Sequence, residues 1–353
     1  MGGRYAFETQ HGRSGHWGVE MRALVVCLVT AGIAGCSGGK SDKEQQKPAA
    51  APARSVNINV ATATTGGAYY PIGNAIAQLW NDKLPGVKAS AQATNGTPHN
   101  IQLLARKDAE VAIAQTGVVY QAVNGVDAYK DQGKQTHFKG MTQLYPNVVH
   151  WVVRKESRVQ GLSDLKGKKF VPGPQNSATE LNSREMLAIL GLDYRARDDL
   201  KADYMDYNQA VEQLKNKHAE AVMLAGGVPT AAVLDGMTSG EGRLLSLPDA
   251  YVQQLTAKYP WYSSFTIPAN SYKGQDRDVK TVAVTNILIV RGDLGDDLVH
   301  DLLNAMYEDT ARLSSAHAAM KAFKLQDGLK GISGVVDLHP VAARFFKEKG
   351  LTN

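Results

Sequence analysis

Cysteine is nearly absent from this sequence. Its 353 residues include two cysteines, Cys27 and Cys36, and both lie near the N-terminus. If the chain is cut before Cys36, the folded part that follows has no thiol for a disulfide, a zinc cluster or a cysteine nucleophile. Those three kinds of site are therefore excluded there, and the chain tolerates export into an oxidising compartment.

A hydrophobic run long enough to span a bilayer is also absent. Residues 24–33 (LVVCLVTAGI) are apolar, but they fall short of the roughly 20 residues that a lasting membrane helix needs. Small residues lead from this run to Cys36 with the spacing of a bacterial lipobox. We expect residues 1–35 to be a lipoprotein-type signal peptide, and Cys36 to be lipidated after cleavage. An uncleaved membrane anchor is the alternative, and a start at Met21 would leave residues 1–20 untranslated.

An excess of charge of one sign is missing as well. The 39 Lys+Arg and 34 Asp+Glu give a formal net charge of +5, spread along the chain, so we expect no nucleic-acid partner. The nine histidines are scattered, with no H-E-x-x-H pair, no G-x-S-x-G elbow and no paired metal-ligand spacing. We expect His150 and His339, which lie beside apolar segments, to be packed in the core. The sequence therefore predicts neither an enzyme nor a metal or cofactor site.

A polar and then Ala/Pro-rich stretch, residues 36–54, precedes the folded part. It has no periodic apolar face, so we expect a flexible tether. The folded part, residues 55–353, is long enough for two lobes. Lipidation of Cys36 would anchor these lobes to a membrane, in the periplasm or an equivalent extracytoplasmic space.

The folded part is organised around residues 57–80, NINVATATTGGAYYPIGNAIAQLW. Alternating apolar residues at its start predict a buried strand, and helical spacing from Ile72 predicts a helix with Pro71 in its first turn. Gly66 and Gly67, between strand and helix, let backbone amides at the helix start approach a ligand closely. This loop is predicted to hold an anion or carboxylate, although it matches neither the dinucleotide fingerprint nor the P-loop. An ordinary strand-to-helix turn is the alternative.

The same succession of strand, polar loop and helix follows twice more. Residues 87–93 and 111–114 have the pattern of strands. Each runs into a small polar loop whose threonine is expected to cap the next helix, Thr97 in one and Thr116 in the other. In an open parallel sheet such loops meet at the carboxyl edge, where ligands bind.

The second half of the chain repeats this organisation between two long strands. Residues 141–154 predict a strand that bends at Pro146, and residues 281–290 predict a strand that returns to the first lobe. Between them, Ser177 and Glu180 form a capping-box pattern at a helix start. The C-terminal helices are expected to pack back on the first lobe.

An internal echo supports two similar lobes. Residues 107–118 and 217–228 each contain a helix end, an Ala-Glu turn, a short apolar strand and a polar loop ending in Gly-Val. The alternative is that any two such cassettes look alike. We favour two α/β lobes that face one another, lobe I at residues 55–147 plus 285–353 and lobe II at residues 148–284.

Several segments of this chain stand in the order found in a known family: TTGGAYYPIGNAIAQLW, QATNGTPHNIQLLA, AEVAIAQTGVVYQAVNG, LYPNVVHWVVR, ATELNSREML, GGVPTAAVLD, KYPWYSSFTIPANSY and LHPVAARFFKEKG. On these segments the chain resembles the TAXI-type solute receptors of TRAP (tripartite ATP-independent periplasmic) transporters. The resemblance covers about residues 56–350. It implies a bilobal type II periplasmic-binding-protein fold, with two α/β lobes joined by crossing strands around a ligand cleft. It also implies capture of a small organic anion, a glutamate-like amino acid or a dicarboxylate or oxo-acid, and delivery to an ion-gradient-driven membrane permease.

The chain departs from this family in the loops of the expected site. The family's Gly-Gly, Gln-Ser-Asp, Gly-Ser-Gly-Thr and Gly-Tyr-Pro stand here, in that order, as Asn95-Gly96, Gln115-Thr116-Gly117, Asn176-Ser177-Ala178-Thr179 and Gly227-Val228-Pro229. Because Gly117 stands where the family has the aspartate of Gln-Ser-Asp, this chain lacks that carboxylate. These departures bear on the ligand and leave the expected fold unchanged.

We expect a carboxylate to be recognised by helix N-termini, hydroxyls and backbone amides. A second carboxylate would need a guanidinium, for which Arg154 is the first candidate, ahead of Arg184 and Arg291. Tyr69 and Tyr70 cannot both face the cleft, so one of them is expected in the core. The other candidate ligand-binding residues are Thr65, Gly66, Gly67, Asn95, Thr97, Gln115, Thr116, Ser177, Thr179 and Gly226.

Several alternatives remain open at the level of sequence. For Thr97 and Ser177, helix capping alone is the alternative to ligand contact. For the whole chain, the alternatives are a receptor of an ABC-type importer or of a membrane sensor kinase, and an exported enzyme on the same fold. The sequence does not predict the identity of the ligand, which membrane holds the anchor, or the oligomeric state.

Overall fold

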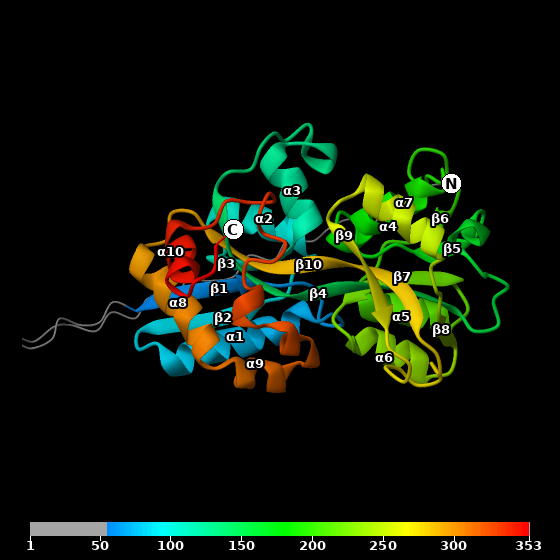
Figure 1. Ribbon diagram of the computed structural model, residues 1–353. Helices are drawn as coiled ribbons and strands as arrows, with labels where there is room; N and C mark the ends of the chain where they lie inside the picture. The colour runs from blue at the N-terminus through cyan, green and yellow to red at the C-terminus, as the bar shows by residue number, and fades with distance from the viewer. Residues whose placement is uncertain (1–54, 353) are drawn as a thin grey trace, which may run out of the picture. The chain divides into compact units, whose positions relative to one another are not determined.

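The computed structural model describes residues 55–352, in which a ten-stranded β-sheet is covered by helices (Figure 1). The predicted signal peptide (1–35) and tether (36–54), with the lipidation site Cys36, lie outside the described residues. Within residues 55–352, no helix combines the length and the apolar character that crossing a membrane requires.

The strands follow the order β2-β1-β3-β10-β4-β7-β5-β6, with β9 beside β10 and β8 beside β4. At each end of this order the strands are parallel, β1 with β2 and β3, and β5 with β6 and β7. Parallel neighbours place the loops after these strands at one edge of the sheet. The strands are β1 (Val56–Ala61), β2 (Val87–Gln92), β3 (Val111–Gln115), β4 (Phe138–Arg154), β5 (Lys169–Val171), β6 (Lys201–Ala202), β7 (Ala221–Gly226), β8 (Gly242–Leu244), β9 (Tyr262–Ile267) and β10 (Val279–Arg291).

Helices cover both faces of the sheet, as Figure 1 shows for α1 and α2 on opposite sides of β1 to β3. Short 3-10 turns lie at residues 127–129, 162–165, 318–322 and 325–327. The α-helices are α1 (Tyr69–Lys83), α2 (Thr97–Arg106), α3 (Thr116–Asn124), α4 (Ala178–Ile189), α5 (Tyr207–Lys215), α6 (Ala231–Thr238), α7 (Asp249–Lys258), α8 (Asp296–Glu308), α9 (Thr310–Ala316) and α10 (Pro340–Glu348).

The strand sequences explain why both faces are covered. Successive side chains of a strand point to opposite faces. Accordingly, Val111 and Ile113 of β3 pack with α1 and α8, whereas Ala112 and Ala114 pack with α2 and α3. In the second half of the sheet, the alternate residues of β7 divide in the same way between a cluster with α4 and α7 and a cluster with α5 and α6. A strand buried on both faces has a continuous apolar sequence, as β3 and β7 do.

Two long antiparallel strands connect the halves of the sheet, which confirms the predicted crossings. The first part of β10 pairs with β9 and its last part with β3, while β4 pairs with β10 along most of its length and with β7 near its end. Pro146 lies inside β4 opposite Thr285, and the register with β10 shifts at the next pair, between Asn286 and Ile287. A proline in a central strand is accommodated at such an irregularity.

The internal echo corresponds to a repeated local structure. Lys107 and Lys217, at equivalent places in the two echo segments, both adopt a left-handed backbone, with φ of 63° and 62°. Each precedes a strand, β3 or β7, that pairs with a crossing strand. We use the predicted boundaries, 55–147 plus 285–353 and 148–284, as a working division into lobe I and lobe II.

Candidate ligand-binding site

A small pocket, with a cavity volume of about 30 Å³, lies where loops of the two lobes meet. None of the described residues that line it carries a charged side chain. Lobe I contributes Ala63, Thr64, Gly67, Ala68, Tyr69, Asn95, Gly96, Thr97 and Asn147, and lobe II contributes Pro174, Ser177, Ala178, Thr179, Tyr207 and Ala225.

The first predicted loop forms one wall of this pocket. Helix α1 begins at Tyr69, which places Pro71 in the first turn as expected. Gly67 lines the pocket, and a Cβ atom there would lie 3.3 Å from Cε2 of Tyr207 in lobe II. At Gly66 a Cβ atom would lie 2.4 Å from the Asn208 side-chain oxygen. The two glycines therefore let lobe I approach lobe II closely, and only Gly67 also borders the pocket.

The second loop places the start of α2 in the pocket, but Thr97 does not cap the helix as predicted. Gly96 is the N-cap residue, with a φ of 92° that favours glycine. The Thr97 hydroxyl accepts a hydrogen bond from the Gln115 backbone amide at 2.9 Å. Thr97 therefore connects the loops after β2 and β3, and both Asn95 and Thr97 line the pocket.

Helix α4 supplies the lobe II wall. The Ser177 hydroxyl accepts a hydrogen bond from the Glu180 amide at 3.1 Å, which confirms Ser177 as the N-cap. The predicted capping box is incomplete, because the Glu180 carboxylate accepts a hydrogen bond from the Tyr194 hydroxyl at 2.8 Å. The Thr179 and Tyr207 hydroxyls are 2.6 Å apart, so the first turn of α4 is bound to the start of α5.

The starts of α1, α2 and α4 thus converge on one uncharged pocket, and α5 adds the side chain of its first residue, Tyr207. First-turn residues of α1, α2 and α4, among them Tyr69, Thr97 and Thr179, are in its lining. The amides of a first turn have no partner within their own helix, and the helix dipole makes this end positive. Such an arrangement favours an anion, and a carboxylate can accept hydrogen bonds from amides and hydroxyls together.

Tyrosine hydroxyls lie beside and beneath the pocket. Tyr69 donates to Oδ1 of Asn286 on β10 at 2.5 Å, and Tyr207 donates to the Ala225 carbonyl at 2.9 Å. Burial raises the pKa of Tyr69, Tyr145 and Tyr207 above the ordinary value of tyrosine. These hydroxyls therefore stay protonated and neutral at physiological pH.

Nine of the fifteen lining residues were not predicted as ligand-binding residues, and Asn147 and Tyr207 are two of them. Asn147 follows Pro146 in the middle of crossing strand β4, and Tyr207 opens α5. An amide at the bend of the strand, directly after Pro146, is a signal that could have singled out Asn147. Tyr207 follows the capping residue Asp206, so its place at a helix start was also readable.

Several predicted residues do not line the pocket. Gly66, Thr65 and Tyr70 are all absent from the lining, with Thr65 exposed and Tyr70 half-buried on α1. Of the two tyrosines, Tyr69 is therefore the one at the pocket. Gly226 ends β7 and packs on Thr230. The last two, Gln115 and Thr116, are buried at the start of α3, where Gln115 is itself the N-cap residue. Thr116 is therefore inside the helix, contrary to the expectation that it caps it.

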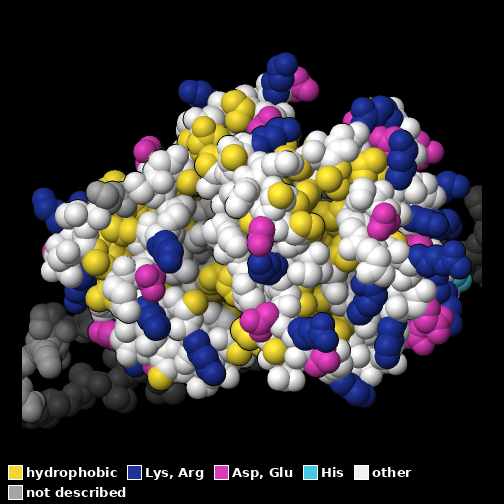
Figure 2. All heavy atoms as spheres, turned by 45° about the vertical axis from the view of Figure 1, so that its right-hand side comes forward, with side chains coloured by type: hydrophobic (Ala, Val, Ile, Leu, Met, Phe, Trp, Pro, Cys, Tyr) yellow, Lys and Arg dark blue, Asp and Glu magenta, His cyan; other side chains and the backbone are white. Residues whose placement is uncertain are grey.

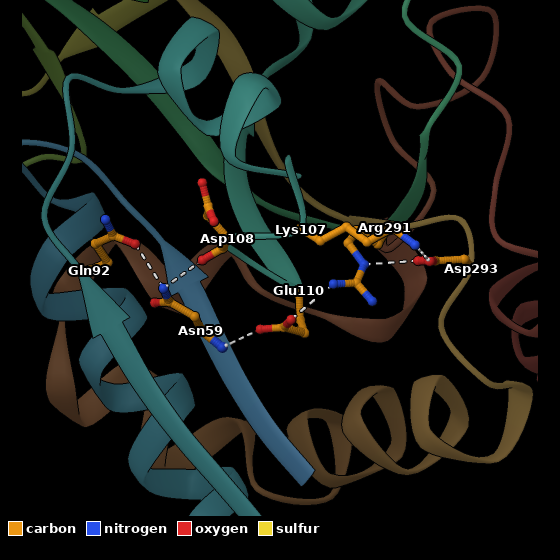
Figure 3. Close-up of polar contacts among 7 residues, drawn as sticks. All are labelled: Asn59, Gln92, Lys107, Asp108, Glu110, Arg291 and Asp293. Carbon is orange, nitrogen blue, oxygen red and sulfur yellow. Dashed lines mark hydrogen bonds and ion pairs between the residues drawn. The ribbon is translucent and has the colours of Figure 1, made fainter. Parts of the chain in front are cut away.

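The structure also places Arg154 away from the pocket, because its guanidinium pairs with Glu220 at 2.8 Å. Arg291 ends the other crossing strand in the same way and pairs with Glu110 at 3.0 Å and with Asp293 at 2.8 Å, as Figure 3 shows. In both lobes the arginine backbone amide also donates to the carbonyl of that glutamate. Each arginine therefore belongs to the repeated structure at the end of a crossing strand.

The remaining arginine candidate is also paired. The Arg184 guanidinium lies 3.0 Å from the carboxylate of Glu180, one turn earlier on α4. Among the residues that the structure describes, no arginine borders the pocket. A guanidinium for a second carboxylate is therefore not present in this lining.

Gln115 belongs to a buried polar network between the lobes. Its side chain donates to Asn182 on α4 at 2.7 Å. Further along α3, Gln121 donates to Oε1 of Glu185 at 2.8 Å, and Tyr262 donates to Oε2 of the same carboxylate at 2.6 Å. Burial raises the pKa of Glu185 to about 7, an effect that these hydrogen bonds partly offset.

The histidines do not contribute to the pocket lining among the described residues. His150 is buried and lies 2.9 Å from the Tyr272 hydroxyl, and burial lowers its pKa to about 4. His339 is buried and caps α10. No group of three His, Cys, Asp or Glu side chains in residues 55–352 is arranged to hold a metal ion.

On the face in Figure 2, basic and acidic side chains are interspersed.

Comparisons with known proteins bear on the fold. The model of the NMT1-like family matches residues 60–350. The chain is similar to a protein of Bordetella bronchiseptica RB50, with a TM-score of 0.53 and 14% identity over 84% of this chain and 98% of that one. It is also similar to a binding protein component of an ABC phosphonate transporter of Pseudomonas aeruginosa, with a TM-score of 0.47 and 12% identity over 74% and 78%. The predicted α/β fold, in two halves joined by crossing strands, is confirmed, and the chain belongs to the NMT1-like family.

Proposed function

We propose that this protein is a TAXI-type solute receptor that captures a small organic anion outside the cytoplasm and delivers it to a TRAP permease. The observation that carries the proposal is the uncharged pocket on which the starts of α1, α2 and α4 converge. Three positive helix ends in one small cavity favour a bound carboxylate. The family segments, which extend through both lobes, support the TAXI assignment.

The predicted lipid anchor fits this role. A receptor lipidated at Cys36 and tethered by residues 36–54 would stay near a permease in the same membrane. Mass spectrometry of the mature N-terminus tests this part, since an unmodified Cys36 would contradict it.

Ligand capture is tested by a thermal-shift screen of the purified protein against amino acids, monocarboxylates, dicarboxylates, oxo-acids and sugars. A ligand at a hundred times its dissociation constant stabilises the folded state by about 2.7 kcal/mol, which raises the melting temperature measurably. We expect stabilisation by organic acids. Co-purified ligand is first removed by unfolding and refolding the protein. If sugars or neutral compounds alone then stabilise it, the proposal that the ligand is an anion is wrong.

The partner is tested separately, because a receptor of an ATP-driven importer could use the same pocket. The receptor and its genomically neighbouring permease are reconstituted in vesicles, and uptake of the stabilising acid is measured. Uptake that needs an ion gradient supports a TRAP system. Uptake that needs ATP hydrolysis identifies an ABC-type receptor, and conversion of the acid to a product identifies an enzyme.

A further inference from the structure

Asn147 is buried at the point where β4 passes from lobe I to lobe II. It pairs with Val284 of β10, it is 4% exposed, and it lines the pocket. Its side-chain oxygen Oδ1 accepts no hydrogen bond from any described residue. Buried polar atoms in folded proteins are nearly always paired, so an unpaired amide oxygen at a pocket indicates a partner supplied by a bound molecule.

Further unpaired polar groups occur on the strands below the pocket. Tyr145 lies two positions before Asn147, on the same face of β4, and its hydroxyl is buried without a partner among residues 55–352. Asn286 lies opposite Tyr145 on β10, and its Nδ2 is also unpaired there. Neither of these two residues lines the pocket, and the Asn286 side chain lies within reach of the Tyr145 hydroxyl, so of the three only Asn147 borders the pocket.

The absence of charged side chains from the described lining of the pocket limits which groups a ligand can place beside Asn147. Because no charged side chain lines the pocket, a second carboxylate beside Asn147 would have no counterion. A neutral hydroxyl, keto or amide group can instead bond directly to the asparagine, since an amide both donates and accepts hydrogen bonds. Arg154, the predicted partner of a second carboxylate, is paired with Glu220.

We infer that the ligand carries one carboxylate, at the helix starts, and a neutral hydrogen-bonding group that Asn147 recognises. This inference rests on the proposed receptor function and narrows its ligand class to small hydroxy-, keto- or amide-substituted monocarboxylates. Asn147 is then the residue that determines specificity, because an analogue without the polar group leaves the buried amide unpaired.

The experiment is calorimetric titration of the purified protein with acids of matched chain length, three to five carbons long. The series comprises unsubstituted monocarboxylates, their hydroxy, keto and amide derivatives, and dicarboxylates. We expect a substituted acid to bind about tenfold or more tightly than the unsubstituted acid of the same length. In Asn147→Leu this ratio should fall to near one, chiefly through loss of affinity for the substituted acid.

Controls separate the possible failures. Asn304→Leu, on α8 outside the pocket, should keep the wild-type ratio. Equal binding of substituted and unsubstituted acids by the wild type, or tightest binding of a dicarboxylate, would overturn the inference while the receptor function stands. An unchanged ratio of the affinities for substituted and unsubstituted acid in Asn147→Leu would also overturn the inference. If the leucine variant does not fold, the same ratio is measured in Asn147→Ser. If no acid binds the wild type, the proposed function itself fails.

Discussion

At the scale of single residues, the pocket depends on side chains that are small or uncharged. Gly67 lets the first loop lie against Tyr207, and Thr97 uses its hydroxyl to connect two loops. Asn147 adds an amide from the crossing strand. Within residues 55–352, the proposed site therefore offers a ligand only uncharged side chains and backbone amides, and a substitution that adds bulk would change these few contacts.

Gly67→Val is the residue-scale prediction for ligand capture. The new Cβ atom would lie 3.3 Å from the Tyr207 ring, and its methyl groups would enter the pocket. Overpacking of this kind costs about 1–3 kcal/mol of stability in a protein core. We expect a loss of similar size in the free energy of binding, which is roughly five- to 150-fold in affinity. Titration with the best acid from the screen should show this loss, with circular dichroism unchanged.

The matched control is Gly295→Val. Gly295 precedes α8 with a φ of −65°, and nothing lies within 4 Å of its added Cβ atom. This variant should bind with wild-type affinity. If folded Gly67→Val also binds like the wild type, the first loop does not belong to the site.

The arginines give a second prediction. Arg154→Ala and Arg291→Ala should each leave ligand affinity unchanged within about twofold, because neither side chain borders the pocket. Each should lower the free energy of unfolding by about 1–2 kcal/mol, since a partly buried ion pair with hydrogen bonds is lost. Urea denaturation and titration measure the two effects. A large affinity loss in Arg154→Ala alone would restore it as a ligand-binding residue.

At the scale of elements, the lobes are held together by more than the crossing strands. Trp261, just before β9, packs against Gly117 of α3, where a Cβ atom would lie 2.5 Å from its ring. Its indole Nε1 donates to Glu185 of α4 at 3.3 Å. Helix α3 of lobe I is thereby joined to α4 and β9 of lobe II through one buried carboxylate.

Glu185 makes stability depend on pH in a definite direction. Its pKa is about 7 in the folded protein, against 4.5 as the ordinary value, because burial disfavours the charged form. The folded state therefore binds the proton more tightly than the unfolded state, and the free energy of unfolding falls as pH rises from 4.5 to 7. The contribution over this window is on the order of 3 kcal/mol.

Comparison with Glu185→Gln isolates this effect. His150, whose pKa is lowered to about 4, contributes a slope of opposite sign between pH 4 and 6.5, and it is unchanged in the variant. Denaturation at several pH values should show the wild type losing stability relative to Glu185→Gln as pH rises through the window. A constant difference between the two proteins would mean that Glu185 does not titrate there.

At the scale of the whole molecule, the sequence predicted the two crossings and most of the strands and helices in their order, but not β6, β8, β9 or α7. It did so because buried strands, polar loops and helix starts each have a local pattern. It placed Gly67, Tyr69, Asn95, Thr97, Ser177 and Thr179 at the carboxyl edge, where the structure brings them together. Their contact with a ligand remains a prediction.

What the sequence did not predict depends on side-chain direction. Arg154 and Arg291 end the crossing strands, but the glutamates of the internal echo hold them away from the pocket. That echo contained the signal, since Glu110 and Glu220 occupy equivalent places in it. Gln115 lies in a pocket-edge loop by sequence, but it faces α4. Only three-dimensional packing distinguishes these directions.

The central claim is that three helix starts from two lobes hold the carboxylate of a small acid. The most direct measurement is a titration of the isotope-labelled protein with the best acid from the screen, followed by backbone amide chemical shifts. The account predicts saturable changes that are largest at Tyr69, Thr97, Ala178 and Thr179, in both lobes at the same ligand concentration. Changes confined to other surfaces, such as the ends of β4 and β10 around Arg154 and Arg291, would contradict it.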